Sequence, residues 1–252
     1  MAQKFMMAAF CLLFSTGALY AQSVDETLDQ ARQLEKQMKE ADALAKYKEV
    51  LKAQPAQLAA LIGASELSSR EGNRQKEKED KTRYFNEAKE YAAEALKAAP
   101  NDANANYAMA VAMGRLALIS GAKEKVAASR DVKKYAELAI KFNPNYGQAY
   151  HVLGKWNYEV ANLSFLEKNA AKALFGGLPD GSMDQAIANY EKCRKLDPGF
   201  ILNYYELARA YNKNDQQTLA MDVLRKAVTL RPVTQDDPGI KAECKKMLEE
   251  LQ

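Results

Sequence analysis

Histidine, tryptophan and cysteine are scarce in this chain. Its 252 residues contain one histidine, one tryptophan and three cysteines. One histidine cannot build a Cys/His cluster of the kind that holds zinc, and no set of these residues has metal-ligand spacing. Glycine-rich phosphate loops, dinucleotide-binding fingerprints and the nucleophile elbow G-x-S-x-G are also missing. The sequence therefore predicts a protein that is not an enzyme and that uses no cofactor and no metal.

Charge of one sign is not in large excess either. The chain has 36 basic and 33 acidic side chains, for a formal net charge of +3. A nucleic-acid-binding domain usually carries a clearly basic face, so we predict no nucleic-acid partner. Segments with the strict alternation of β-strands are lacking, whereas Ala, Leu, Lys and Glu are abundant. This composition favours an all-helical protein.

Residues 1–21 have the pattern of a secretory signal peptide. Lys4 precedes an uncharged run from Phe5 to Ala21, after which the chain becomes polar. We predict cleavage after Ala21 and a periplasmic or secreted protein. The alternative is a retained membrane anchor, although the run falls short of the ~18–20 residues that span a bilayer. Cleavage leaves Cys193 and Cys244, which we expect to be free, buried thiols rather than a disulfide, because two cysteines define no disulfide framework.

A period of 34 residues decides the predicted fold. Residues 186–198 read A-x3-Y-x2-C-x4-P, and residues 220–232 read A-x3-L-x2-A-x4-P. This is the spacing of the tetratricopeptide (TPR) repeat, in which each unit is a pair of antiparallel helices. The closing proline recurs at Pro55, Pro100, Pro144, Pro198 and Pro232. We predict an all-α, TPR-type right-handed α-α superhelix of about five helical hairpins.

The second helix of each pair shows where neighbouring helices should pack. Small, bulky and small residues are expected twelve, eight and five positions before each closing proline, on one helix face. The triplets are Ala43-Tyr47-Val50, Ala88-Ala92-Ala95, Val132-Ala136-Ala139, Ala186-Tyr190-Cys193 and Ala220-Leu224-Ala227. We expect all of them to be buried.

Two further helices complete the predicted domain, residues 22–252. Residues about 162–181 form an insertion with an amphipathic stripe that includes Leu166 and Leu174. We expect this stripe to pack against the array, or alternatively to lie over the groove and shelter an acyl chain. Residues about 238–251 should form a capping helix that covers the last repeat, because solenoids must hide their terminal apolar faces.

The first helix of each pair should line a concave groove. The predicted ligand-binding residues on this face are Arg70, Tyr107, Arg115, His151, Lys155, Tyr158, Tyr205, Arg209 and Lys213. Their cations and tyrosines suit an anionic partner such as a peptide carboxylate or a phosphate head group. The alternatives are a general peptide groove, or a solvated helix face with no ligand. The lone His151 is more typical of a polar or packed ring than of a metal ligand.

The stretch from Leu153 to Phe200 resembles one family of TPR-like proteins. It reads L-G-K-W-N-Y, then L-S-F-L-E-K, and closes on P-G-F. These motifs resemble the regulator of microtubule dynamics family, with Lys155 in place of Arg and Phe165 in place of Trp. The resemblance implies a non-catalytic TPR-like domain, association with microtubules and, in one branch, membrane tethering and phospholipid binding. Microtubules are an unexpected partner for an exported chain.

These observations predict a non-catalytic, exported TPR scaffold that binds a protein or peptide through its concave groove. The first alternative is a protein that binds an anionic phospholipid or tethers a membrane. The second is an enzyme whose site has no recognised motif.

Overall fold

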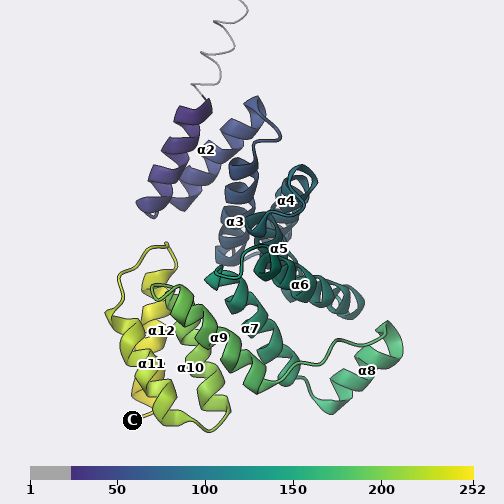
Figure 1. Cartoon of the computed structure of the whole chain (residues 1–252), viewed down its shortest axis with the longest axis vertical. Coiled ribbons are helices and arrows are strands. Elements are labelled where there is room, and N and C mark those ends of the chain that lie inside the picture. Colours follow the sequence, from purple (N-terminus) through teal and green to yellow (C-terminus); the bar gives the residue numbers. More distant parts are fainter. Residues whose placement is uncertain (1–23) are drawn as a thin grey trace, which may run out of the picture.

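The computed structural model describes residues 24–252, and the predicted signal peptide at residues 1–21 lies outside this range. All regular structure in the described part is helical (Figure 1). Residues 24–36 form the first helix. The others are α2 (Glu40–Ala53), α3 (Leu58–Arg74), α4 (Lys78–Ala98), α5 (Ala103–Ile119), α6 (Ala122–Phe142), α7 (Gly147–Ala161), α8 (Phe165–Phe175), α9 (Met183–Leu196), α10 (Ile201–Lys213), α11 (Gln217–Thr229) and α12 (Asp237–Glu250).

The helices pair as the repeat predicts. Residues 24–36 pair with α2, α3 with α4, α5 with α6, α7 with α9, and α10 with α11, while α8 is inserted and α12 packs on α10 and α11. The five predicted triplets are all buried, and most of their residues are fully inaccessible. The prediction of a TPR-type superhelix with five hairpins, an inserted helix and a C-terminal cap is confirmed.

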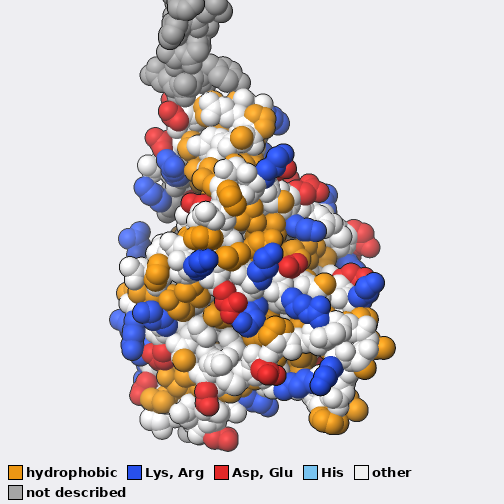
Figure 2. Space-filling view, turned by 45° about the vertical axis from the view of Figure 1, so that its right-hand side comes forward, with side chains coloured by type: hydrophobic (Ala, Val, Ile, Leu, Met, Phe, Trp, Pro, Cys, Tyr) orange, Lys and Arg blue, Asp and Glu red, His pale blue; other side chains and the backbone are white. Residues whose placement is uncertain are grey.

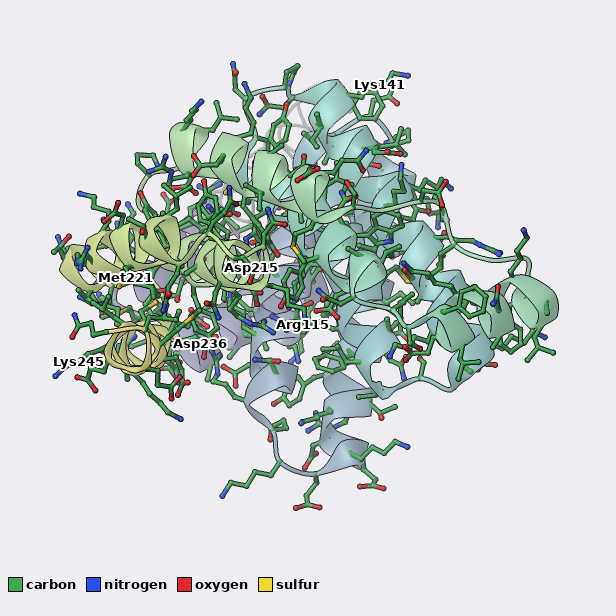
Figure 3. The ribbon with its side chains drawn as sticks, turned by 90° about the horizontal axis from the view of Figure 1, so that it is seen from below. Arg115, Lys141, Asp215, Met221, Asp236 and Lys245 are labelled. Atoms are coloured by element: carbon green, nitrogen blue, oxygen red, sulfur yellow. The ribbon has the colours of Figure 1, made fainter. Side chains whose placement is uncertain are left out.

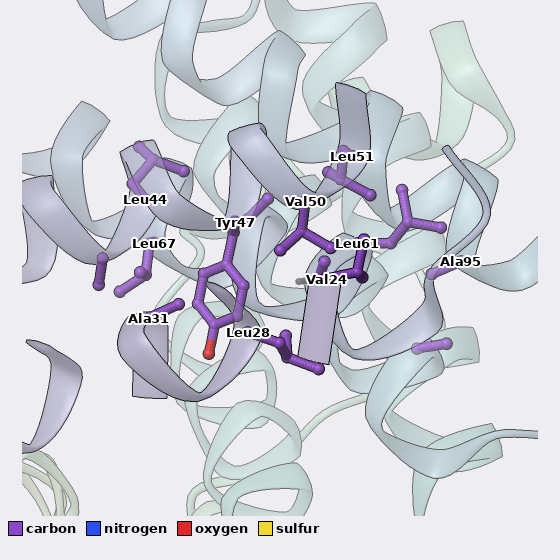
Figure 4. Close-up of a cluster of buried hydrophobic side chains, with 14 residues drawn as sticks. Val24, Leu28, Ala31, Leu44, Tyr47, Val50, Leu51, Leu61, Leu67 and Ala95 are labelled. Atoms are coloured by element: carbon purple, nitrogen blue, oxygen red, sulfur yellow. The ribbon is translucent and has the colours of Figure 1, made fainter. Parts of the chain in front are cut away.

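Glycines on the first helix of a pair let a bulky residue approach from a second helix, either of the preceding pair or of the same pair. A Cβ atom added at Gly63 would lie 2.5 Å from the Tyr47 ring, and one at Gly154 would lie 2.8 Å from the Tyr190 ring. Real Cβ atoms do not come this close, so a larger residue at either position forces the helices apart. Tyr47 lies in the apolar cluster of the first repeat (Figure 4).

The core is divided along the array. One large apolar cluster joins residues 24–36 to α2 and α3, and a second joins α9, α10, α11 and α12. Between them lie three smaller clusters: one around Ala92 and Ala108, one around Tyr107 and Ala139, and one around Trp156 and Val160. Each repeat therefore packs mainly on its neighbours, as a solenoid does.

The inserted helix α8 differs from its prediction. Ser164 and Glu167 form a capping box at its start, and Arg130 of α6 donates to the carbonyl oxygen of Gly177 at 3.0 Å at its end. The predicted packing of its apolar stripe is wrong, since Leu166 is 78% exposed and Leu174 is 69% exposed. Only Ala171 is buried on this helix. The helix is thus held at its two ends while most of its apolar side chains face solvent.

The last helix covers the end of the array. Cys244 is fully buried between α12 and the last hairpin, in the same cluster as Leu224. Cys193 and Cys244 are both free and buried, which confirms the prediction for these thiols. Within residues 24–252, none of the helices has the length and apolar character to cross a bilayer.

Candidate functional site

Helices α3, α5, α7 and α10 contact one another in sequence and form the inner surface of the array. This surface carries the nine predicted groove residues. The space-filling view shows Lys, Arg, Asp and Glu side chains interspersed over the face that it presents (Figure 2). The inner surface is likewise mixed in charge, because carboxylates sit between its cations.

Three of the predicted cations are neutralised by glutamates. Arg70 pairs with Glu40 at 3.0 Å. Lys155 and Arg209 converge on the buried carboxylate of Glu206, at 3.1 and 2.9 Å. Glu206 holds both cations in place and balances one of their two charges, and Glu159 also pairs with Lys155 at 2.9 Å. The inner surface therefore alternates in sign and is not a continuous line of positive charge.

Arg115 is different, because it has no acidic partner of its own. It donates to Asn73 Oδ1 at 3.1 Å and forms no ion pair with a carboxylate of residues 24–252. Burial lowers its pKa below the ordinary arginine value, and the neighbouring Arg70 lowers it further. In the view from below, Arg115 lies near the middle of the molecule, whereas Lys141 and Lys245 lie at the periphery (Figure 3). A half-buried guanidinium without an acidic partner is available to bind an anion.

Tyr107 and His151 are largely buried, as is Tyr158, which is 9% exposed. Tyr107 is 8% exposed and packs against the Tyr146 ring, with 5.0 Å between ring centroids. His151 is 7% exposed, and its Nδ1 lies 3.2 Å from Asn203 Oδ1. Burial lowers the pKa of His151 to about 4, so the ring is neutral at physiological pH. His151 is a packed ring, and Tyr107 exposes only a small part of its side chain.

Four of the predicted residues, Arg209 among them, meet at one cavity. Tyr158, Tyr205, Arg209 and Lys213 line a cavity of about 380 Å³ between α7, α10 and α12. Its far wall is made by residues of α12 and the chain end: Glu243, Lys246, Met247, Glu250 and Leu251. The sequence thus predicted one side of this cavity and missed the other.

Two tyrosines hold an arginine in the wall of the cavity. The Arg209 guanidinium lies 5.2 Å from the centroid of the Tyr158 ring and 5.9 Å from that of Tyr205. These distances are within the range of cation–π attraction. Glu206 adds a hydrogen bond at 2.9 Å. Four groups therefore share a rigid arrangement that offers aromatic faces and guanidinium N–H donors to a ligand.

The residues that sequence reasoning missed are mainly acidic. Glu206 is only 7% exposed and appears in the sequence as one more charge on a helix. Its position between Tyr205 and Leu207, one turn from Arg209, was the available signal. The residues of α12 gave no signal, because only the packing of the cap brings them to α10.

The two ends of the array also touch. The linker between α11 and α12, residues 230–236 and called here the closing linker, lies beside α2 and α3 (Figure 1). Asp236 accepts a hydrogen bond from Arg74 at 3.0 Å, across 162 positions of sequence. The backbone N–H of Gln235 donates to Glu40 Oε1 at 3.2 Å. These contacts close the superhelix beside its inner surface.

The inserted helix is remote from the cavity. It packs on α6, and it lies on the other side of the molecule from α12 in Figure 1. The predicted alternative in which this helix lies over the groove is therefore wrong. In the described part of the chain, His, Cys, Asp and Glu residues do not gather in groups of three or more that could hold a metal.

Comparison with known proteins finds one protein family whose sequences match this chain. The sequence model of regulator of microtubule dynamics proteins 1-3 matches residues 27–252. Regulator of microtubule dynamics protein 2 of Bos taurus is 30% identical over 170 residues, which are 67% of this chain and 42% of that protein. Protein 1 of Bos taurus is 30% identical over 171 residues, 68% of this chain and 54% of the relative. The chain spans about half of these relatives or less.

Solved structures show the same fold at low sequence identity. The thermophilic TPR protein TTC0263 of Thermus thermophilus superposes with a TM-score of 0.64 at 17% identity, covering 88% of this chain and 99% of that one. The pilF protein of Pseudomonas aeruginosa superposes with a TM-score of 0.54 at 12% identity, covering 92% and 93%. These likenesses concern the fold alone.

Proposed function

Because the chain belongs to the family of regulator of microtubule dynamics proteins 1-3, we propose that it is a non-catalytic scaffold that binds a protein segment at its inner surface. The resemblance in residues 153–200 is confirmed by the family match over residues 27–252. The fold is a stacked array that presents a continuous surface, which supports a binding role.

One observation carries this proposal: the cavity that Tyr158, Tyr205 and Arg209 share with α12. Tyrosine and arginine are enriched among the residues that dominate protein–protein binding energy, especially where they are held rigid. Arg209 is held by Glu206 and by two aromatic rings, so little side-chain freedom is lost when a ligand binds. Lys213 and Lys246 line the same cavity as Glu243 and Glu250, which suits a segment with mixed charge.

Export is part of the same proposal. Its support is the pattern of Lys4 followed by the uncharged run from Phe5 to Ala21. An exported chain does not meet tubulin, so the proposal assigns no microtubule partner. If the apolar run is retained, it anchors the same scaffold to a membrane.

Site-specific photo-crosslinking tests the binding role. A benzophenone amino acid at Tyr205 should crosslink a protein in a cell-envelope extract, and Arg209→Glu should abolish that crosslink. The matched control places the same amino acid at Tyr91 of α4, remote from the cavity, where we expect no specific product. A Tyr205 crosslink that survives Arg209→Glu, or one that contains only lipid, would contradict the peptide-binding proposal.

A second candidate function is contact with an anionic membrane surface through α8. Phe165 is 77% exposed and Leu166 is 78% exposed, and apolar side chains gather at the lower right of Figure 2, where α8 protrudes. Lys168 and Lys172 on the same helix are exposed. A convex apolar tip with lysines beside it suits the interface of an anionic bilayer better than it suits an extended peptide.

Vesicle flotation separates the two functions. The protein should float with phosphatidylserine-containing vesicles and not with pure phosphatidylcholine, and Phe165→Ser with Leu166→Ser should remove that binding. Leu219→Ser is the control, because it alters another exposed leucine, 43% accessible, on α11. Equal flotation of both variants would remove α8 from the membrane-binding surface while leaving the cavity proposal intact.

A further inference from the structure

The closing linker places a carboxylate on an arginine of the second hairpin. Asp236 accepts from Arg74 Nη1 at 3.0 Å, and the same nitrogen donates to Glu40 Oε2 at 2.9 Å. Glu71 accepts from the other terminal nitrogen at 2.5 Å. Asp236 is the partner that comes from the far end of the chain, and its side chain is 30% exposed.

We propose that the closing linker is an internal ligand, which occupies a site for acidic peptide segments formed by Arg74 and Arg115. This inference goes beyond the cavity at α12: it assigns a second site on the inner surface, for a segment with consecutive carboxylates. In this structure the site holds the chain's own Asp236. An acidic partner would displace the linker and, in doing so, open the end of the inner surface.

The charges around the linker fit this assignment. Arg115 forms no ion pair with a carboxylate in the described chain, and Asp236 is close enough to raise its pKa against the effect of burial. Asp236 thus pairs directly with Arg74, while Arg115 donates to Asn73, the residue next to Arg74. A partner with two carboxylates would satisfy both arginines, and planar guanidinium groups bind carboxylates with two parallel hydrogen bonds.

The contacts of the closing linker allow it to leave the first repeats as one unit. Its shape is set from α12, because Asp237 accepts from the backbone N–H groups of Val233 and Thr234 at 2.7 and 2.8 Å. Its ties to the first repeats are polar contacts of Gln235 and Asp236. The apolar cluster of the first repeat and that of the last hairpin share no residue. Release of the linker therefore breaks polar contacts and leaves both apolar clusters intact.

A distance measurement tests whether the linker is released. Spin labels at Lys39→Cys and Val233→Cys, both exposed positions, should give one short distance in the otherwise unchanged protein. The native Cys193 and Cys244 are buried. Asp236→Ala should add a longer, broader population, and so should hexaglutamate peptide added to the parent protein. A distance that neither change alters would overturn the proposal.

A binding measurement tests whether the vacated site takes an acidic peptide. Fluorescein-labelled hexaglutamate should bind Asp236→Ala about fivefold or more tighter than the parent, because the internal competitor is gone. Asp222→Ala is the matched control: it removes one carboxylate from an exposed i,i+3 pair with Arg225 and should leave the affinity unchanged. Adding Arg74→Gln to Asp236→Ala should reverse the gain, with helicity measured to show that the variant is folded. Labelled hexaglutamine should not bind.

The outcomes separate this inference from the proposed function. Equal affinity of Asp236→Ala and Asp222→Ala would show a net-charge effect and overturn the internal-ligand proposal. The photo-crosslink at Tyr205 reports on the cavity at α12 and does not depend on hexaglutamate. If the Tyr205 crosslink is not formed but hexaglutamate binds as expected, the cavity proposal is refuted and the proposed arginine site stands.

Discussion

His151 illustrates how burial decides what a residue type does. As the only histidine of the chain, it was a candidate for binding, yet it packs beside the Phe200 ring with 4.8 Å between centroids. Asn203 contacts its Nδ1 and also donates to the carbonyl oxygen of Tyr190 at 2.9 Å. Sequence identified the residue and its helix, but the partners that bury it come from other parts of the chain.

Titration of this histidine is a direct test at the residue scale. Burial lowers its pKa from the ordinary 6.5 to about 4. The neutral ring is favoured in the folded state, so His151 costs no stability above pH 6.5, and folding loses stability as pH falls from 6.5 toward 4. In an untagged protein, NMR should show one imidazole signal that titrates below pH 5. A midpoint between 6 and 7 would mean that the ring is solvated.

Gly154 tests the packing rule of the repeat. Gly154→Ala should lower the free energy of unfolding by about 2 kcal/mol, because the new methyl group meets the Tyr190 ring in a close-packed core. Gly239→Ala is the control, since nothing lies within 4 Å of the added atom, and alanine in a helix is favoured by up to about 1 kcal/mol. Urea denaturation measures both. Equal effects would show that the helices are free to separate at Gly154.

At the element scale, α8 shows where pattern reasoning was right and where it was wrong. The apolar stripe and the glycines after it predicted an extra helix, and it is present as Phe165–Phe175. The amphipathic stripe also predicted packing, but the stripe is exposed. Periodicity indicates that a helix has an apolar face and does not indicate what covers that face.

The attachment of α8 depends on one long side chain. Arg130 donates to the carbonyl oxygens of Phe175 and Gly177 at the helix end, where intrahelical donors run out. Arg130→Ala should increase hydrogen exchange of residues 165–175 severalfold while α6 and α7 stay protected, because α8 contributes little to the core. Lys134→Ala on the same helix as Arg130 is the comparison. Unchanged exchange in α8 would mean that the capping box alone holds it.

At the scale of the whole molecule, a buried carboxylate ties the two ends together. Glu40 is 1% exposed and accepts from Arg70, Arg74 and the Gln235 N–H. Burial acts to raise its pKa, but Arg70, the Gln235 N–H and Arg74 outweigh burial and hold the pKa below the ordinary 4.5. A lowered pKa means that Glu40 stabilises the fold above pH 4.5 and that this stability is lost as pH falls through the folded value.

Glu40→Gln should therefore destabilise the protein by about 2–3 kcal/mol, since it leaves two arginines short of a buried partner. Glu94→Gln is the control, because its pair with Lys97 is exposed and such pairs contribute about 0–1 kcal/mol. Chemical denaturation at neutral pH should separate the two variants, and the difference should shrink in acid. Equal free energies of unfolding for Glu40→Gln and Glu94→Gln would mean that the contacts between the two ends do not stabilise the fold.

The sequence by itself determined the helical pairs, the residues buried between them and the family. These features depend on contacts at fixed short spacing, such as the small-bulky-small triplets, whose partners lie in the same or the next repeat. Tertiary structure alone decided the neutralising carboxylates, the α12 wall of the cavity and the contact of Asp236 with Arg74. Those depend on the curvature that accumulates over all the repeats, and curvature arises from many small packing angles that no local pattern records.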